Sequence, residues 1–303
     1  MKSIKIGTRG STLALAQTAW VKEKLQEQYP GASIEIIRIK TSGDRFFEAS
    51  LQAIGGKGIF TKEIEDTLLR DEIDIAVHSM KDLPTALPIG LIVAAIPPRE
   101  DPRDVLVSVA ATKLSELPAG ARIGTGSLRR TAQLRYYRRD LMIVPIRGNV
   151  DTRLKKLDQG EYDALVMAAA GLKRIGREEK IAEYIPNDIC LAAAGQGALG
   201  LEAREDDSIC EQLSFLHDPA TFAEVTAERS FLNRLGGGCH VPVGARGAAQ
   251  GEALTLFGVV ANPDGSVLFR GETAGCTAHA EKLGCELAER LLSEGAQQIL
   301  LAG

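Results

Sequence analysis

The segment RLGGGCHVPVG, residues 234–244, places a cysteine in an unusual setting. Three consecutive glycines precede Cys239, and Pro242 follows it closely. Glycine offers no side chain for packing and permits positive φ, while proline restricts the backbone and removes a donor. A structural cysteine usually lies among apolar neighbours instead. The pattern therefore predicts a turn that displays the Cys239 thiol as a reactive or covalently modified group.

The remaining cysteines and histidines do not have the spacing of metal ligands. The five cysteines are scattered and include no C-x-x-C pair, so we expect neither a disulfide framework nor a zinc knuckle. His240 directly follows Cys239, but the usual zinc motifs separate their ligands by two or more residues. We therefore expect no metal site.

Arginine is concentrated in one part of an otherwise acidic chain. The net charge is −4, yet residues 121–156 contain ten basic and only two acidic side chains. Guanidinium groups bind carboxylates through two parallel hydrogen bonds, which lysine cannot do. Several of them in one cleft would suit a ligand with several carboxylates. A solvated helix face remains the simpler explanation for Arg138, Arg139, Lys155 and Lys156.

Two strands are predicted to end at similar turns. IGTRGS (6–11) and IGTGS (123–127) each lead through Gly-Thr into a serine at the start of a helical pattern. Ser11 and Ser127 are therefore predicted N-caps, and the helix starts behind them suit anions. The carboxyl ends of strands are also where open α/β sheets bind ligands. The arginines near these ends and near the next helix start, at Asn149, are Arg9, Arg129, Arg130, Arg147 and Arg153.

Two further segments indicate an internal duplication. EIDIAVHSMKDL (72–83) and EYDALVMAAAGL (161–172) share one register. The first copy places Lys81 and Asp82 beyond its strand, whereas the second has Ala170 and Gly171 there. Asp82 could donate a proton or stabilise a developing cation. A purely structural carboxylate, paired with Lys81 at a turn, is the alternative.

Hydrophobic periodicity predicts an α/β protein with two similar lobes and a small α+β C-terminal domain. Strand and helix patterns alternate through residue 96 and again from 105 to about 190, which is typical of largely parallel sheets. PPREDPRD (97–104) has the composition of a linker, and residues 192–204 suit a return crossover. A hairpin signal around residues 262–265 marks the last domain. The predicted domains are 1–97 with 198–216, 102–193, and 219–303.

Composition excludes several classes of protein. The 303 residues are 45% hydrophobic and 25% charged, as in ordinary globular proteins, and no apolar run approaches the roughly 20 residues that span a membrane. The amino terminus lacks an apolar signal region, so we expect a cytoplasmic protein. Net acidity and the absence of a recognition module argue against nucleic-acid binding. An enzyme using Asp82 and Cys239, and a two-lobed carboxylate-binding protein without catalysis, both remain; the displayed thiol favours the enzyme.

Taken together, the motifs of this chain resemble those of the porphobilinogen deaminase family. The resemblance implies a transferase of porphyrin and haem (tetrapyrrole) biosynthesis that deaminates four porphobilinogen molecules and joins them to a covalent dipyrromethane primer. Hydroxymethylbilane and ammonia would be released. It further implies two periplasmic-binding-protein-like lobes and a monomer without nucleic-acid or membrane partners. The matching segments, in family order, are IGTRGSTLALAQ, GGKGIFTKE, VHSMKDLPT, PPREDPRDVLVS, GTGSLRRTAQL, PIRGNVDTRL, LDQGEYDA, GQGALG and ERSFLNRLGGGCHVPVG.

The same resemblance implies roles for individual residues. Cys239 would carry the dipyrromethane through a thioether, and Asp82 and Lys81 would be the catalytic residues, with Asp82 assisting proton movements. One departure is Gly126, where many members have serine, which removes a hydroxyl that could bind a carboxylate. The implied cofactor contacts are Lys81, Asp82, Thr125, Ser127, Arg129, Arg130, Arg147, Gln196 and Gly197. The implied substrate contacts are Arg9, Ser11, Lys57, Ser79, Arg147, Asn149, Arg153 and Arg174.

Overall fold

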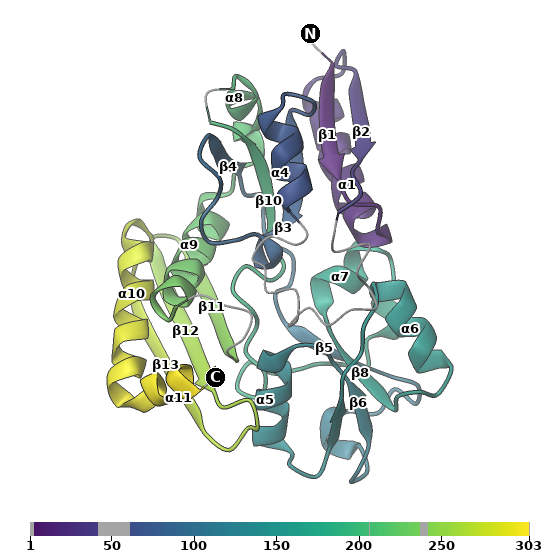
Figure 1. Ribbon diagram of the computed structural model, residues 1–303, viewed down its shortest axis with the longest axis vertical. Coiled ribbons are helices and arrows are strands. Elements are labelled where there is room, and N and C mark those ends of the chain that lie inside the picture. Colours follow the sequence, from purple (N-terminus) through teal and green to yellow (C-terminus); the bar gives the residue numbers. More distant parts are fainter. Residues whose placement is uncertain (1–2, 42–60, 206, 237–241, 303) are drawn as a thin grey trace. The chain divides into compact units, whose positions relative to one another are not determined.

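A computed structural model describes residues 3–41, 61–205, 207–236 and 242–302 of the chain (Figure 1). Cys239 and Lys57 therefore lie outside the described residues. The chain divides into two compact units, Met1–Pro98 with Ala198–Asp218, and Arg99–Gly197 with Pro219–Gly303. No helix of the described chain is both long and apolar enough to cross a bilayer.

The first unit is built on a five-stranded sheet with the order β2-β1-β3-β10-β4. The predicted parallel pairing holds for β1, β2 and β3, but β10 lies between β3 and β4 and is antiparallel to both. Residues 192–204 are thus more than a crossover, because their second half completes this sheet. The strands are β1 (Ile4–Thr8), β2 (Ile34–Arg38), β3 (Ile75–Ser79), β4 (Leu91–Ala95) and β10 (Leu199–Arg204).

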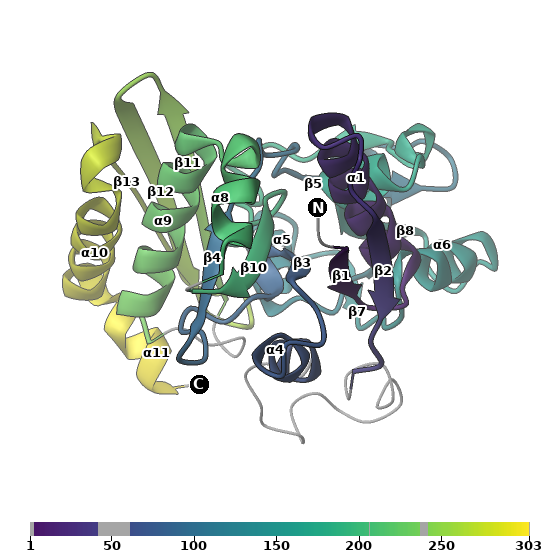
Figure 2. The ribbon, with the colours of Figure 1, turned by 90° about the horizontal axis from the view of Figure 1, so that it is seen from above.

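Helices cover both faces of this sheet (Figure 2). Ile75 and Val77 of β3 pack with α1 and α8 on one face, while Ala76 packs with α4 on the other. This alternation follows from the two-residue period of a strand. The helices are α1 (Thr12–Gln28), α4 (Lys62–Leu69) and α8 (Ile209–Leu213).

The second unit contains a sheet of the same design, with the order β7-β6-β8-β5-β9. Here β5 is the antiparallel strand, pairing with β8 and β9. Helix α5 packs on one face, and α6 and α7 on the other. The elements are β5 (Asp104–Ser108), β6 (Arg122–Gly124), α5 (Leu128–Tyr137), β7 (Met142–Val144), α6 (Val150–Asp158), β8 (Ala164–Ala168), α7 (Ala169–Arg174) and β9 (Glu183–Tyr184).

The predicted duplication is present in structural detail. The ungapped alignment of residues 72–83 with 161–172 extends back through α4 and α6, and it pairs Asp71 with Gly160, both of which have positive φ (59° and 75°). It also pairs Asp74 with Asp163. Each of these carboxylates accepts a hydrogen bond of 2.7 Å from a backbone N–H at the start of its neighbouring strand. The two lobes therefore share geometry as well as sequence.

The last part of the chain is a three-stranded antiparallel sheet, β11-β12-β13, against which α9 and α10 pack (Figure 1). The predicted hairpin is confirmed by β12 and β13. Strand β11, VGARGAAQ, was not predicted because its composition disfavours strands. A Cβ at Gly247 would lie 2.7 Å from Glu224 Cα, so glycine there permits close packing against α9. The elements are α9 (Pro219–Arg234), β11 (Val243–Gln250), β12 (Ala253–Ala261), β13 (Leu268–Cys276), α10 (Ala280–Leu291) and α11 (Gln297–Ala302).

Candidate active site

The carboxyl end of β3 carries the predicted catalytic pair. A 3₁₀ turn, Met80–Asp82, follows the strand directly. Lys81 and Asp82 are exposed on this turn, whereas Met80 is buried. The Met80 backbone N–H donates to the carbonyl oxygen of Ala198 at 3.0 Å. The turn that displays Asp82 is therefore anchored to the sheet by both its buried side chain and its backbone.

The predicted helix N-caps at Ser11 and Ser127 are confirmed, and Asn149 caps the next helix in the same way. Ser11, Ser127 and Asn149 each accept a hydrogen bond from the backbone N–H three residues further on, at 3.3, 3.4 and 2.9 Å. The Thr125 hydroxyl accepts from the Ser127 N–H at 3.2 Å. Near the end of β3, Ser79 accepts from a side-chain amide, that of Gln17, at 2.9 Å. Each of these polar residues thus stabilises a strand end or a helix start.

Arg129 and Arg130 converge on a buried carboxylate that the sequence did not reveal. Arg129 Nη1 lies 2.6 Å from Asp104 Oδ2, and Arg130 Nη2 lies 2.7 Å from Asp104 Oδ1. Gln196 Nε2 donates to Asp104 Oδ1 at 2.8 Å. Burial alone would raise the pKa of Asp104, but the two guanidinium groups outweigh it and hold that pKa well below its usual range. Asp104 is therefore ionised.

The charges of this cluster do not cancel. Two guanidinium groups face one carboxylate, and burial raises the pKa of the adjacent Cys190 thiol to about 12, so that the thiol is neutral. The cluster of Arg129, Arg130 and Asp104 therefore has a net charge of +1, which would suit a bound anion. Asp104 was expected in a linker because of the composition around it, and this is corrected: it begins β5 and is fully buried.

A third guanidinium, that of Arg174, lies beside the predicted contacts Gln196 and Gly197. Arg174 Nη2 donates to the Gly197 carbonyl at 2.7 Å. Burial lowers the pKa of Arg174 to about 10, opposed by the charge of Glu100. Gly197 has φ +88°, and a Cβ there would lie 2.2 Å from the Glu100 carbonyl oxygen, so only glycine fits. A partly desolvated cation of this kind is suited to binding an anion.

The other predicted contacts differ in exposure. Arg147 is exposed, while Arg9 and Arg153 are half-buried. Arg153 Nε donates to the Gly148 carbonyl at 2.8 Å, which holds its side chain along the first turn of α6. Asp104, Arg129, Arg130 and Gln196 are brought into one cluster by the structure; a single site that includes all predicted contacts stays a prediction.

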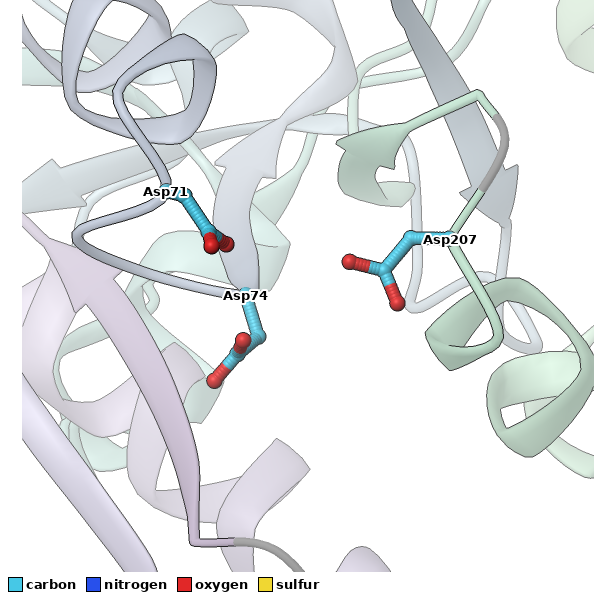
Figure 3. Close-up of side chains that lie close together, drawn as sticks. All are labelled: Asp71, Asp74 and Asp207. Atoms are coloured by element: carbon cyan, nitrogen blue, oxygen red, sulfur yellow. The ribbon is translucent and has the colours of Figure 1, made fainter.

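Three other carboxylates lie close together but are occupied by a cation of the chain itself. Figure 3 shows Asp71, Asp74 and Asp207, each with an oxygen within 4.8 Å of the others. Arg204 Nη2 forms ion pairs with all three, including one of 2.9 Å to Asp71. Arg204 therefore balances part of the negative charge of this group.

Comparison with known proteins identifies the family. The sequence model of the family domain described as "Porphobilinogen deaminase, dipyromethane cofactor binding domain" matches residues 4–212. The family model of the porphobilinogen deaminase C-terminal domain matches residues 222–293. The chain belongs to the porphobilinogen deaminase family. Porphobilinogen deaminase of Syntrophotalea carbinolica is 52% identical over 99% of this chain and 96% of its own length. That of Syntrophus aciditrophicus is 54% identical over 98% and 97%.

Membership of the porphobilinogen deaminase family makes the chain an enzyme of tetrapyrrole biosynthesis, a transferase with a dipyrromethane cofactor and porphobilinogen as substrate. A carboxylate-binding protein without catalysis is not favoured. Among solved structures, the alkanesulfonate-binding protein SsuA of Xanthomonas axonopodis pv. citri is similar with a TM-score of 0.39, at 13% identity over 78% of this chain and 76% of that one.

Proposed function

We propose that Cys239 holds the dipyrromethane through a thioether and that Asp82 drives the addition of four porphobilinogen molecules to it, with release of hydroxymethylbilane and ammonia. The observation that carries this proposal is the charge of the Asp104 cluster. Two buried guanidinium groups and one carboxylate leave a positive charge suited to a carboxylate of a bound ligand. The alternative without catalysis offers no use for Asp82 or the cysteine loop.

The residues around this cluster suit the carboxylate side chains of the cofactor. When bound, the cofactor supplies the pyrrole to which the first substrate is joined. Arg129 and Arg130 would bind the carboxylates of the cofactor through N–H groups that do not donate to Asp104. Thr125, Ser127, Arg147, Gln196 and Gly197 would complete the binding surface, and Lys81 and Asp82 would face the pyrrole nitrogens.

Asp82 is proposed as the acid–base group. The substrate must lose its amino group as ammonia, which requires a proton, and the pyrrole carbon that attacks must later lose one. An exposed carboxylate on an anchored turn can transfer these protons and can stabilise the cation between the two steps. Lys81, its neighbour, would orient the carboxylates of the reacting units.

The substrate side of the site is proposed to contain further cations and helix starts. Each porphobilinogen adds an acetate and a propionate, so negative charge accumulates as the chain grows. Half-buried guanidinium groups such as Arg174, and capped helix N-termini, suit such groups. The proposed substrate contacts are Arg9, Ser11, Lys57, Ser79, Arg147, Asn149, Arg153 and Arg174.

The organisation of the enzyme is part of the same proposal. Residues 1–97 with 198–216 would form the lobe carrying the catalytic acid, 102–193 the arginine-rich lobe, and 219–303 the domain carrying Cys239. The enzyme would act as a cytoplasmic monomer without nucleic-acid or membrane partners.

The intact mass of the purified protein tests the anchor. The chain alone is 32.4 kDa. We expect an excess equal to one dipyrromethane in the wild type, and its loss in Cys239→Ser, with Cys285→Ser as the matched control that retains it. Wild-type protein is then supplied with porphobilinogen, and hydroxymethylbilane is measured. An excess mass that persists in Cys239→Ser would refute the anchor, and absent product from loaded protein would refute the function.

A further inference from the structure

Three ionisable side chains are buried beneath the turn that carries Asp82. Glu202 of β10 is 0% exposed, and His78 of β3 and Glu65 of α4 are 6% exposed. His78 Nε2 lies 2.9 Å from Glu202 Oε2. Within the described chain, neither carboxylate forms an ion pair with lysine or arginine, and Glu202 Oε1 and Glu65 Oε1 are buried without a hydrogen-bond partner. We call Glu65, His78 and Glu202 the buried trio.

The residues of the second lobe that correspond to the buried trio are all apolar. In the alignment of the duplicated segments, Glu65 corresponds to Leu154 and His78 to Met167. Glu202 corresponds to Val107 by strand register. Glu202 pairs with Ala76 in the first lobe, and Val107 pairs with Leu165, the counterpart of Ala76, in the second. Leu154, Met167 and Val107 all belong to one apolar core cluster. The fold therefore accepts three hydrocarbon side chains where the first lobe has three ionisable ones.

This difference requires a reason, because a buried ionised group is costly unless it is paired. Burial raises the pKa of Glu65, the Thr61 hydroxyl and His78 oppose this shift, and the negative charge of Glu202 adds to it. The carboxylate in direct contact with His78 is that of Glu202. Two other charged groups of α4 lie near: Asp66, which acts on Glu65 in the same direction as Glu202, and Lys62, which lines a cavity of about 300 Å³ with Glu65.

The trio is joined to the catalytic turn by a short and direct connection. His78 is followed by Ser79 and by the turn that displays Lys81 and Asp82. Strand β10 holds the same segment from the other side, since Gly200 is opposite His78 in the strand register and Ala198 accepts the Met80 N–H. A Cβ at Gly200 would lie 2.3 Å from Met80 Sδ, so β10 also determines how the turn packs.

We propose that the Glu202–His78 pair is a positioning device for the reaction: it holds the end of β3, and with it Lys81 and Asp82, in the arrangement that turnover requires. This inference rests on the function proposed above. Glu202 is a positioning residue, since it acts through His78 and does not reach the substrate. The second lobe has no reacting group at its corresponding turn, and it has no such pair.

The test transplants the second lobe's residues into the first. The holoenzyme variant Glu65→Leu, His78→Met, Glu202→Val is compared with wild type for kcat, KM, cofactor mass and thermal unfolding. Replacing buried ion pairs by well-packed apolar residues is often neutral or stabilising. We therefore expect a folded, cofactor-loaded protein with kcat reduced by about 10- to 100-fold, the loss typical when the hydrogen-bond partner that orients a metal-ligating histidine is removed, and with KM little changed.

Single variants separate the members of the trio and serve if the triple variant does not fold. Glu202→Gln should lower kcat and displace its pH profile, whereas Glu65→Gln, which imitates the protonated acid, should leave both unchanged. Wild-type kcat and pH profile in Glu202→Gln would overturn the inference, as would equal losses in the two variants. Absent turnover in the loaded wild type would instead overturn the proposed function itself.

Discussion

The two lobes have the same sheet design but contain their buried ionisable groups in different places. In the first, these groups are His78, near the end of β3, and its partner Glu202. In the second lobe the corresponding positions are apolar, and the buried carboxylate is Asp104, which pairs with Ala168 at the end of β8. The corresponding pair in the first lobe is Leu199 and Ser79. Asp104 binds two arginines of α5. The two lobes thus share a backbone design, but each buries its own ionisable groups: His78 and Glu202 in the first, Asp104 with two arginines in the second.

The largest expected effect on turnover comes from Asp82, at the end of β3 in the first lobe. Asp82→Asn should keep the fold and the cofactor but lower kcat by about 10² to 10⁴-fold, because it removes the proposed acid–base group. Asp158→Asn, at the exposed end of α6, is the matched control and should leave kcat unchanged. Steady-state turnover of porphobilinogen measures both. Near-normal kcat in Asp82→Asn would remove this residue from the mechanism.

The next effect concerns the charge cluster of the second lobe. Asp104→Asn keeps the side-chain shape but leaves two buried guanidinium groups without their carboxylate. Breaking a buried ion pair from one side costs about 3 to 5 kcal/mol in the free energy of unfolding. Chemical denaturation measures this loss, with Asp101→Asn, whose Arg103 partner has a half-buried side chain, as the control. A loss no greater than that of the control would show that Asp104 does not hold the arginines.

The two lobes should also respond to pH in opposite directions. The pKa of Asp104 is lowered in the folded protein, so its contribution to stability is present above its unfolded value of about 4 and is lost as the pH falls below it. The pKa of Glu65 is raised, so its contribution is full at acid pH and is lost as the pH rises through the folded value.

Two variants make this opposition measurable. The destabilisation caused by Asp104→Asn should shrink on acidification, whereas Glu65→Gln should become more stable relative to wild type as the pH rises. Denaturation curves from acid to neutral pH would record both differences. Parallel trends in the two variants would contradict the assigned pKa directions.

The smallest effect tests the turn of the second lobe that contains Gly126. A Cβ at Gly126 would lie 2.9 Å from the Ile146 carbonyl oxygen, which is backbone and cannot move freely. Gly126→Ser should therefore cost about 1 to 3 kcal/mol in the free energy of unfolding, as overpacking does. Gly10→Ser in the first lobe, where a Cβ meets nothing within 4 Å, is the control. An unchanged stability of Gly126→Ser would show that the turn relaxes at no cost.

Much of this protein was predictable from local sequence. The strand and helix alternation, the N-caps at Ser11 and Ser127 and the hairpin after β12 all depend on residues within a few positions of one another, where periodicity and capping chemistry act. The duplication was visible because two segments of the chain repeat the same pattern. The roles of Cys239 and Asp82 came from motifs in the same way, and they stay proposals. Strand β11 was missed because Gly244 and Gly247 serve close packing, Gly247 against α9, which local composition does not report.

Only the tertiary structure decided which charges are buried and what they contact. Asp104 looked like a linker residue until the sheet placed it against arginines 25 and 26 residues away. His78 and Glu202 are 124 residues apart, and β10 became a strand of the first sheet only because the chain returns between β3 and β4. The physical reason is common to both. Burial and pairing of a charge depend on neighbours brought together by folding, whereas a sequence pattern reports only what is near along the chain.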